Sequence, residues 1–284
     1  MKFKIITDST ADIPAHLLKK YDVSVASLEV IMGGTPRRAC ELSNEEFYAF
    51  LDDCLKQNKP LPTTSQASMG EFEALLAPYA NLEDTFVAVL TIPKEMSSTY
   101  QSAARAIDAL EMKNVHLFDT RVTSFALGAV VVELAKLLAE RELTVEEMIA
   151  AGNDLNLRVQ LALAIGDLRC LRAGGRLSTT SMALGSLLRI NPIVCVDRKV
   201  DVCAKALGEG KAMKWIAEKA AAERDPAMPL YFGHTQSPEL IEKYRARYGA
   251  LLALNGEEES FAMGAVIGVH SGPGCAGIVY FAKK

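Results

Sequence analysis

The sequence predicts an α/β protein with two domains: residues 1–152 with a doubly wound parallel sheet, and residues 153–284 with a mixed, partly antiparallel sheet. A chain of 284 residues is long enough for two ordinary domains. In the first half, short and fully apolar runs alternate with amphipathic stretches, as in parallel sheets covered by helices on both faces. In the second half, pairs of apolar runs flank turn residues, which is typical of hairpins.

The N-terminal domain is predicted from four apolar runs. We expect strands at Phe3–Thr7, Val23–Ile31, Phe86–Thr91 and Val115–Phe118. Helices are expected at Pro14–Lys20, Phe47–Leu55, Phe72–Tyr79, Ser98–Leu110 and Ser124–Glu140. Ser43 and Ser68 each precede a glutamate by three residues, the spacing of a capping box at a helix start.

Three loops of this domain are predicted to meet at one edge of its sheet. They are Thr7–Thr10, Thr91–Ser98 and Asp119–Thr123, and each follows a predicted strand. Ligands of parallel α/β sheets bind beyond the carboxyl ends of the strands. We therefore expect a ligand site at this edge.

The C-terminal domain is predicted to begin near Gly152-Asn153. A further helix is expected before it, with Thr144 and Glu147 at its capping positions. Strands are expected at Val159–Ile165, Ile193–Val196, Val200–Ala204, Leu230–Gly233, Val266–Val269 and Gly277–Phe281. Helices are expected at Thr180–Arg189, Lys211–Arg224 and Ser237–Leu254. The segment Asp197-Arg198-Lys199 separates two of the strands and predicts a hairpin turn.

Charge and hydropathy exclude several classes of protein. The net charge of -4 argues against a nucleic-acid-binding surface, since such surfaces neutralise phosphates with Lys and Arg. No uninterrupted apolar run reaches the ~18 residues of a membrane-spanning helix, so we expect at most transient contact with a membrane. The first apolar run is too short for a signal peptide, and Asp8 follows it closely. We therefore predict a cytoplasmic location.

The cysteines and histidines form no recognisable metal or redox motif. The six cysteines are scattered without a C-x-x-C pair, at Cys40, Cys54, Cys170, Cys195, Cys203 and Cys275. In a reducing compartment we expect them to be buried thiols that serve as small apolar side chains. The four histidines are equally dispersed, without an H-E-x-x-H motif. We therefore predict no metal site and no cofactor.

Loops rich in hydroxyl and small residues are the main functional signal. They contain Thr64-Ser65, Ser97-Ser98, Gly174-Gly175-Arg176 and His270-Ser271-Gly272-Pro273-Gly274. Hydroxyls and backbone N–H groups at helix starts hold anions well. No acid–base pair or nucleophile elbow accompanies these loops in the sequence. The pattern therefore favours the binding of an anionic head group over catalysis.

Each loop also has a purely structural interpretation, which the residues alone leave open. Ser97 is suited to capping a helix, and Thr64-Ser65 to a plain loop ahead of Ser68, the better cap. Arg176 is either a solvated turn residue or a guanidinium aimed at a ligand that approaches the glycine backbone. His270, at the end of a predicted strand, is either a structural histidine or a ligand contact.

Taken in order, these segments resemble the DegV family, the fatty-acid-binding proteins of bacteria, over essentially the whole chain. The resemblance rests on Ile6-Thr-Asp-Ser-Thr-Ala-Asp-Ile-Pro14, Thr64-Ser-Gln-Ala-Ser68, Ser97-Ser-Thr-Tyr-Gln-Ser102, Asp119-Thr-Arg-Val-Thr-Ser124, Leu171-Arg-Ala-Gly-Gly-Arg-Leu177, Leu188-Arg-Ile-Asn-Pro-Ile193 and His270-Ser-Gly-Pro-Gly274. It implies a non-catalytic carrier that holds one long-chain fatty acid in a tunnel between its domains. It also implies a partner, a fatty-acid kinase that phosphorylates the presented carboxylate.

The resemblance carries the contacts with the fatty-acid carboxylate over to six residues: Thr64, Ser65, Ser97, Ser98, Arg176 and His270. Two positions depart from the family pattern. Ala67 stands where the family often has proline, which we expect to matter little. Many kinase-coupled members carry an arginine after the central hairpin, whereas Lys205–Lys211 contains none. If that arginine serves kinase docking, either a lysine replaces it or the partner differs.

Two enzyme classes are the alternatives. A nucleotide-binding enzyme would fit a doubly wound sheet, but no G-x-G-x-x-G follows a predicted strand, and Gly208-Glu-Gly-Lys211 lacks the spacing of a P-loop. A hydrolase would use Ser97 as nucleophile and His270 as base, but Ser97 lacks the G-x-S-x-G elbow. The carrier is therefore the preferred hypothesis.

Overall fold

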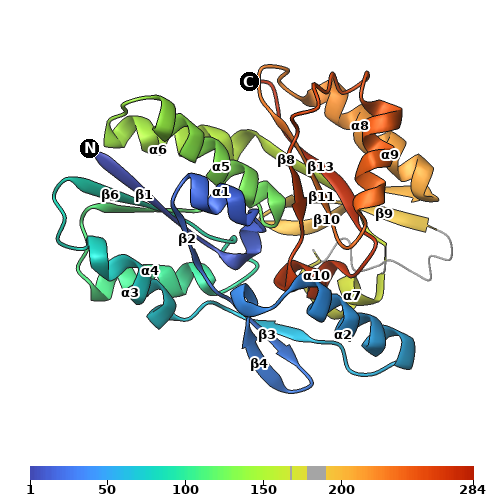
Figure 1. Ribbon diagram of the computed structural model, residues 1–284, viewed down its shortest axis with the longest axis horizontal. Coiled ribbons are helices and arrows are strands. Elements are labelled where there is room, and N and C mark those ends of the chain that lie inside the picture. The colour runs from blue at the N-terminus through green and yellow to red at the C-terminus, as the bar shows by residue number, and fades with distance from the viewer. Residues whose placement is uncertain (167, 178–189) are drawn as a thin grey trace.

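The computed structural model describes residues 1–166, 168–177 and 190–284, which form three β-sheets with helices packed around them (Figure 1). Sheet A has the strand order β2-β1-β6-β7, and all of its neighbouring strands are parallel. Its strands are β1 (Lys2–Asp8), β2 (Val23–Ala26), β6 (Thr85–Leu90) and β7 (Val115–Phe118). The predicted N-terminal parallel sheet is thus confirmed.

Helices cover both faces of sheet A, because its strands carry apolar side chains on both faces. Ile5 of β1 packs with the helices of one face, and its neighbour Ile6 packs with those of the other. On one face lie α1 (Ala15–Lys20), α5 (Phe125–Glu140) and α6 (Val145–Arg158). On the other lie α3 (Met69–Leu76) and α4 (Thr99–Ala109). The two predicted capping serines are confirmed: Ser43 Oγ accepts from Glu46 N, and Ser68 Oγ accepts from Glu71 N.

Sheet C is the mixed sheet predicted for the second half, with the order β10-β9-β8-β13-β11-β12. Only the β11–β12 pair is parallel among these described strands. The strands are β8 (Val159–Ala164), β9 (Ile190–Asp197), β10 (Lys199–Leu207), β11 (Leu230–His234), β12 (Ser260–Ala262) and β13 (Ala276–Phe281). Helices α8 (Glu209–Glu223) and α9 (Pro238–Tyr248) cover one face of this sheet (Figure 1). Two short helices, α7 (Leu168–Ala173) and α10 (Ala265–Ser271), contact each other beside this sheet.

A third, antiparallel sheet corrects two predictions. The expected single strand Val23–Ile31 is divided, because Ser27 N binds the Glu71 carboxylate and Leu28 N binds the Ser9 hydroxyl in place of a strand partner. Thr64-Ser65, expected in a plain loop, lies in a strand. The sheet has the order β4-β3-β5, with β3 (Glu29–Met32), β4 (Thr35–Arg38) and β5 (Thr63–Ser65). The remaining elements nearby are α2 (Asn44–Gln57) and the 3-10 turns η1 (Ser9–Ala11), η2 (Ala39–Glu41) and η3 (Ala77–Tyr79).

Other predictions in the second half differ from the structure. Val266–Val269, expected as a strand, lies in helix α10, since a run of four apolar residues carries no period that separates helix from strand. Helix α9 ends at Tyr248 rather than at Leu254. The expected helix Thr180–Arg189 lies outside the described residues. Gly152-Asn153, the predicted domain boundary, falls inside α6, and the two-domain division stays a prediction.

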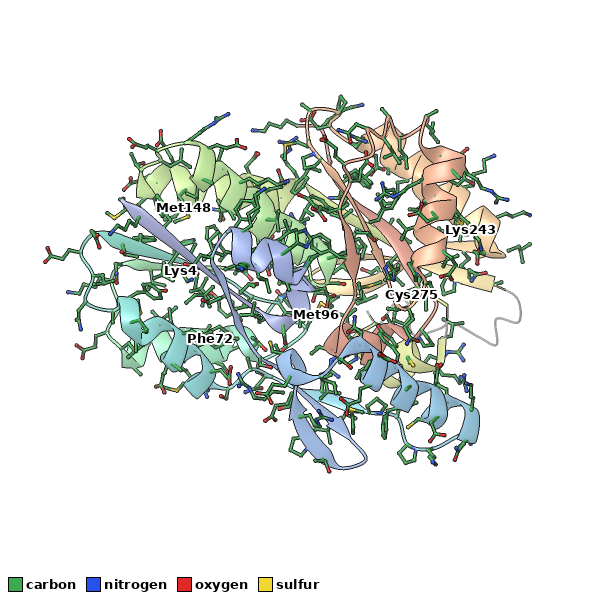
Figure 2. The ribbon with its side chains drawn as sticks, viewed as in Figure 1. Lys4, Phe72, Met96, Met148, Lys243 and Cys275 are labelled. Carbon is green, nitrogen blue, oxygen red and sulfur yellow. A yellow bond between two sulfur atoms is a disulfide. The ribbon has the colours of Figure 1, made fainter. Side chains whose placement is uncertain are left out.

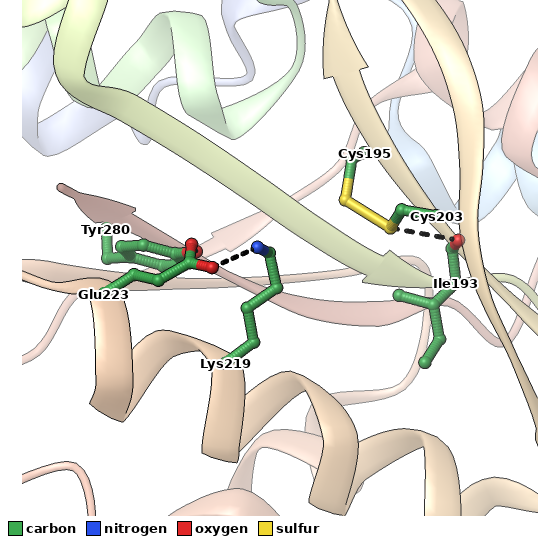
Figure 3. Close-up of a disulfide and its surroundings, with 6 residues drawn as sticks. All are labelled: Ile193, Cys195, Cys203, Lys219, Glu223 and Tyr280. Carbon is green, nitrogen blue, oxygen red and sulfur yellow. Dashed lines mark hydrogen bonds and ion pairs between the residues drawn. A yellow bond between two sulfur atoms is a disulfide. The ribbon is translucent and has the colours of Figure 1, made fainter.

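The cysteines correct another expectation. Cys195 and Cys203 form a disulfide across the β9–β10 hairpin (Figure 3). Their Cα atoms are 5.9 Å apart, within the range that a disulfide spans. A bulge between Val202 and Ala204 shifts the register of the two strands at Cys203. Of the cysteines outside this disulfide, Cys40 is exposed, and Cys54, Cys170 and Cys275 are buried. Within the described ranges, no helix is both long and apolar enough to span a membrane.

Helix α5 connects the two large sheets through one continuous core. It contacts β1 of sheet A and β8, β11 and β13 of sheet C, and its first eight residues are all buried. Gly128 allows this close packing: a Cβ there would lie 2.3 Å from Ala11 O and 2.6 Å from the Phe261 ring. The spacing leaves no room for a side chain at this position.

We predict that Gly128→Ala lowers the free energy of unfolding by about 1–3 kcal/mol, because overpacking here outweighs the gain in helix propensity. Urea denaturation measures the change. Gly210→Ala is the matched control, because Gly210 also lies in a helix and its nearest neighbour, Arg247 Nη1, is 3.7 Å from an added Cβ. This control is expected to be neutral or stabilising by up to about 1 kcal/mol. Equal destabilisation of both variants would contradict the packing argument.

Candidate functional site

A cavity of about 420 Å³ lies between the loops at the carboxyl edge of sheet A and the face of sheet C opposite α8. This volume is within the usual range of small-molecule sites. Met96, one of its lining residues, lies near the middle of the molecule, where the sheets approach each other (Figure 2). The cavity thus occupies the edge at which the sequence predicts a ligand site.

Part of the cavity lining is apolar. Alternate residues of β8 and β9 face it, because successive side chains of a strand point to opposite faces. The apolar lining also includes side chains from β10, α7 and α10. The residues are Leu161, Leu163, Ile165, Leu171, Val194, Val196, Val200, Val266 and Ile267.

The polar part of the lining contains all six predicted site residues. Thr64, Ser65, Ser97, Ser98, Arg176 and His270 come from β5, the loop before α4, the turn after α7, and α10. These segments are far apart in the sequence. The structure therefore brings the six together around one cavity, and their contact with a carboxylate remains to be tested.

Thr64 and His270 meet directly in this lining. Thr64 Oγ1 lies 3.0 Å from His270 Nε2, across the gap between β5 and α10. Gly174 makes room for the imidazole, since a Cβ there would lie 2.5 Å from His270 Nδ1. The first glycine of the pair before Arg176 thus allows the backbone to lie close to the His270 ring.

His270 is uncharged at neutral pH. Burial, together with the neighbouring Arg176 guanidinium, lowers the pKa of His270 to about 4. A neutral imidazole both donates and accepts a hydrogen bond. The positive charge of the polar lining at this point therefore comes from Arg176, whose Nη1 donates to Gly174 O at 2.7 Å.

Ser97 combines the structural and the functional interpretation. Its Oγ accepts from Thr99 N at 3.2 Å, which supports the first turn of α4, and it also lines the cavity. Thr99 Oγ1 lies 2.9 Å from Ser97 Oγ and accepts from Ala67 N at 3.3 Å. The loop after β5 and the loop before α4 are thus joined. Ser98, at the N-cap of α4, makes no side-chain capping bond and is exposed.

The Thr7–Thr10 loop supports the site without lining the cavity. Asp8 Oδ1 accepts from Thr10 N at 2.8 Å, and Asp8 Oδ2 accepts from Ile92 N at 2.7 Å. Ile92 begins the loop that leads to Ser97. Burial raises the pKa of Asp8, opposed by these bonds. The role of Asp8 is therefore to fix the loop after β6.

Sequence reasoning missed several lining residues. Gln66 and Ser271 directly follow predicted site residues, and Thr123 and Ser124 end the motif that begins at Asp119. Lys94 and Glu95 also line the cavity, and Lys94 Nζ contacts the Asp119 carboxylate at 3.2 Å. Ser124 has a φ of 58°, which non-glycine residues rarely adopt. The signal that could have found it is the position of the motif after β7.

The geometry does not form the serine–histidine pair of a hydrolase. In the described part of the chain, His270 Nε2 contacts Thr64, and the Ser97 hydroxyl contacts Thr99. A nucleophile and its base must lie within hydrogen-bonding distance of each other. The arrangement therefore favours binding.

We predict that the ligand-free protein loses stability in acid because of His270. The pKa falls from about 6.5 in the unfolded chain to about 4 in the fold, so the contribution is complete above pH 6.5 and disappears as the pH falls to 4. At about 1.4 kcal/mol per pKa unit, the loss is on the order of 3 kcal/mol. Denaturant titrations at several pH values measure it. His270→Gln, which does not titrate, should lose less by this amount, and identical pH profiles would contradict the assignment.

The fold and the cavity define an α/β protein with a cavity between two sheets, lined by both polar and apolar residues. A family model described as "Uncharacterised protein, DegV family" matches residues 2–283. A DegV domain-containing protein of Caldanaerobacter subterraneus subsp. tengcongensis is 31% identical over 291 residues, which cover 100% of this chain and 99% of the relative. The chain belongs to the DegV family.

Solved structures of the family have the same fold. The structure of a DegV family protein from Thermus thermophilus, whose description names fatty acid binding, superposes with a TM-score of 0.87 at 27% identity. The superposition covers 100% of both chains. DegV of Bacillus subtilis, described as a fatty acid binding protein, superposes with a TM-score of 0.79 at 29% identity, again over 100% of both chains. The predicted family and the predicted mixed α/β fold are thus confirmed.

Proposed function

We propose that this protein binds a long-chain fatty acid in the cavity. The observation that carries the proposal is that its lining combines hydroxyl, imidazole and guanidinium groups with many aliphatic side chains. The carboxylate lies at Thr64, Ser65, Ser97, Ser98, Arg176 and His270, and the tail lies along the aliphatic wall from β8, β9 and β10. The fatty-acid binding described for two related structures supports the class of ligand.

The energetics suit such a ligand. A carboxylate leaves water at a high cost unless hydrogen bonds and a cation replace its hydration. The hydroxyls and Arg176 supply both. Each buried methylene contributes about 0.8 kcal/mol, so a tail of about fourteen contributes on the order of 11 kcal/mol before ordering costs. The tail therefore supplies most of the affinity, and the head-group contacts supply orientation.

We further propose that the protein acts as a non-catalytic carrier in the cytoplasm, presenting the carboxylate to a fatty-acid kinase. Arg176 is exposed and lines the cavity, so a partner could reach a carboxylate held beside it. Lys205 and Lys211 are exposed in the stretch that lacks an arginine, so either is available to replace it. A kinase that requires arginine there would be a different partner.

The test of binding begins with delipidated protein. We expect it to take up one long-chain fatty acid per chain, and native mass spectrometry should detect the added mass. Protein purified without delipidation should carry a similar mass. Delipidated protein without affinity for any acid of 14 to 18 carbons would refute the proposal.

The head group is tested with Thr64→Val, which keeps the shape of the side chain and removes its hydroxyl. A hydrogen bond to a charged group contributes about 1.5–3 kcal/mol, so affinity for the acid should fall roughly ten- to a hundredfold. The methyl ester, which lacks the charge, should lose much less. Equal losses for acid and ester would place the carboxylate elsewhere.

A further inference from the structure

Asp12 joins three segments that lie far apart in the sequence. It follows η1 at the carboxyl end of β1. Its Oδ2 accepts from Ser124 Oγ at 2.8 Å, and its Oδ1 accepts from Gly264 N at 2.8 Å. Ser124 begins α5 and Gly264 begins α10, so one carboxylate ties the edge of sheet A to both helices.

Both partners of Asp12 lead directly to the site. Ser124 lines the cavity and holds a φ of 58°, a conformation that a serine keeps only when its surroundings fix it. Gly264 lies six residues before His270, on the short helix that carries the imidazole to Thr64. A displacement at the start of α10 would therefore be transmitted to the 3.0 Å contact between His270 and Thr64.

The surroundings of α10 leave it little freedom at the same end. Tyr48 of α2 donates its hydroxyl to Met263 O at 2.9 Å, just before Gly264. A Cβ at Gly268 would lie 2.5 Å from the Phe47 ring. These contacts limit how far α10 can move, and the hydrogen bond from Gly264 N to the Asp12 carboxylate adds a polar link at the same point.

We propose that Asp12 is a positioning residue of the binding site: its carboxylate fixes the start of α10 and thereby holds His270 against Thr64. The inference concerns the geometry of the ligand-free site and holds whatever the ligand is. It goes beyond the head-group contacts, because Asp12 does not line the cavity.

The charged form of Asp12 is only partly favoured in this setting. Burial raises the pKa of Asp12 to about 7, the bonds from Gly264 and Ser124 oppose the rise, and the Asp8 carboxylate in the same turn adds to it. Tyr48 faces Asp12 from α2, while Ser124 and Gly264 are neutral. A protonated Asp12 still accepts from Gly264 N and donates to Ser124 Oγ, so the link survives in either form.

The structure therefore predicts different outcomes for two substitutions. In Asp12→Asn, the amide oxygen accepts from Gly264 N and the amide nitrogen donates to Ser124 Oγ, so both bonds remain. In Asp12→Ala, both are lost and α10 is released at its start. A role in charge alone would make the two variants alike, whereas a positioning role separates them.

The experiment is a titration of the histidine rings of the ligand-free protein by two-dimensional NMR, which follows only four imidazoles. In the wild type and in Asp12→Asn, the pKa of His270 should stay near 4. In Asp12→Ala we expect it to rise toward 6.5, the value of a solvated imidazole, because the ring leaves its buried place. Thr144→Ala is the control, because it removes the capping box of α6 and should leave His270 unchanged.

If Asp12→Ala does not fold, Asp12→Glu replaces it, because a glutamate keeps the charge and moves the acceptors by one methylene. The pKa of His270 should rise in this variant too. A pKa that stays near 4 in the displaced variants would overturn the proposal, as would an equal rise in Asp12→Asn. No lipid is present in this measurement, so its outcome is independent of whether the protein binds fatty acids.

Discussion

Leu163→Trp should lower the affinity for a long-chain fatty acid by about a hundredfold or more. Leu163 lies on the central strand β8, is buried, and faces the apolar part of the cavity. An indole at this position fills the space of about four methylenes of the tail, each of which contributes about 0.8 kcal/mol. The loss of about 3 kcal/mol corresponds to a factor of more than a hundred.

The length of the acid provides a second observation in the same experiment. A tail that is too short to reach β8 does not meet the indole. Short-chain acids, which bind weakly in any case, should therefore be affected much less than acids of 16 to 18 carbons. Isothermal titration with a series of acids measures both effects.

Leu207→Trp is the matched control for this substitution. Leu207 lies on β10 of the same sheet, is 63% exposed, and does not line the cavity. The control should bind every acid as the wild type does. Unchanged affinity in Leu163→Trp, with the fold intact, would place the tail away from this face of sheet C.

Much of the fold could be predicted because its signals are local. The strands of sheet A are short apolar runs between capped helices, and their parallel order follows from this alternation. The ligand edge then follows from the carboxyl ends of the strands. For the same reason the positions of the loops that contain Ser97 and Asp119 can be predicted from the sequence.

The remainder depends on pairing between distant residues. Thr64 pairs with Val30 in a small sheet whose existence no local pattern indicates. The Cys195–Cys203 disulfide joins two strands beside a bulge in β10, and the sequence reveals neither feature. The bonds of Asp12 reach across 112 and 252 residues. Contacts between residues so far apart in the sequence can be identified only from the folded structure.

The site, like the fold, could be predicted only in part from the sequence. Its six residues were identified by resemblance, and the sequence alone left each with a structural alternative. The structure removes part of that ambiguity by a distance: His270, predicted on a strand, lies on α10 and contacts Thr64. Its neutral state could not be inferred, because the lowered pKa results from burial and from Arg176, which only the fold brings near.

On the proposed carrier function, Arg176→Ala and His270→Ala should retain the lipid and lose its transfer to a kinase. Retention follows because the tail supplies most of the binding energy, about 0.8 kcal/mol for each methylene. Transfer requires more. In this step a carboxylate oxygen attacks the terminal phosphorus of a nucleoside triphosphate. The bond between that phosphorus and the bridging oxygen breaks, and the nucleoside diphosphate leaves. Two anions must therefore approach each other.

The two residues contribute differently to this step. Arg176 supplies the positive charge that offsets the repulsion between the carboxylate and the triphosphate. His270, which is neutral, holds the Thr64 hydroxyl and thereby the orientation of the carboxylate. Interactions that act mainly on the transition state affect the rate more than the affinity, and removing one such group lowers the rate on the order of a hundredfold.

The measurement is kinase turnover with each variant loaded to equal lipid occupancy, which mass spectrometry verifies. Arg141→Ala is the control, because Arg141 is an exposed arginine at the end of α5 and does not line the cavity. It should support turnover at the rate of the wild type. Normal rates with Arg176→Ala and His270→Ala would exclude both residues from the transfer step. No turnover with the unmodified protein would instead identify the kinase as the wrong partner, in line with the stretch Lys205–Lys211, which lacks the arginine expected from the resemblance.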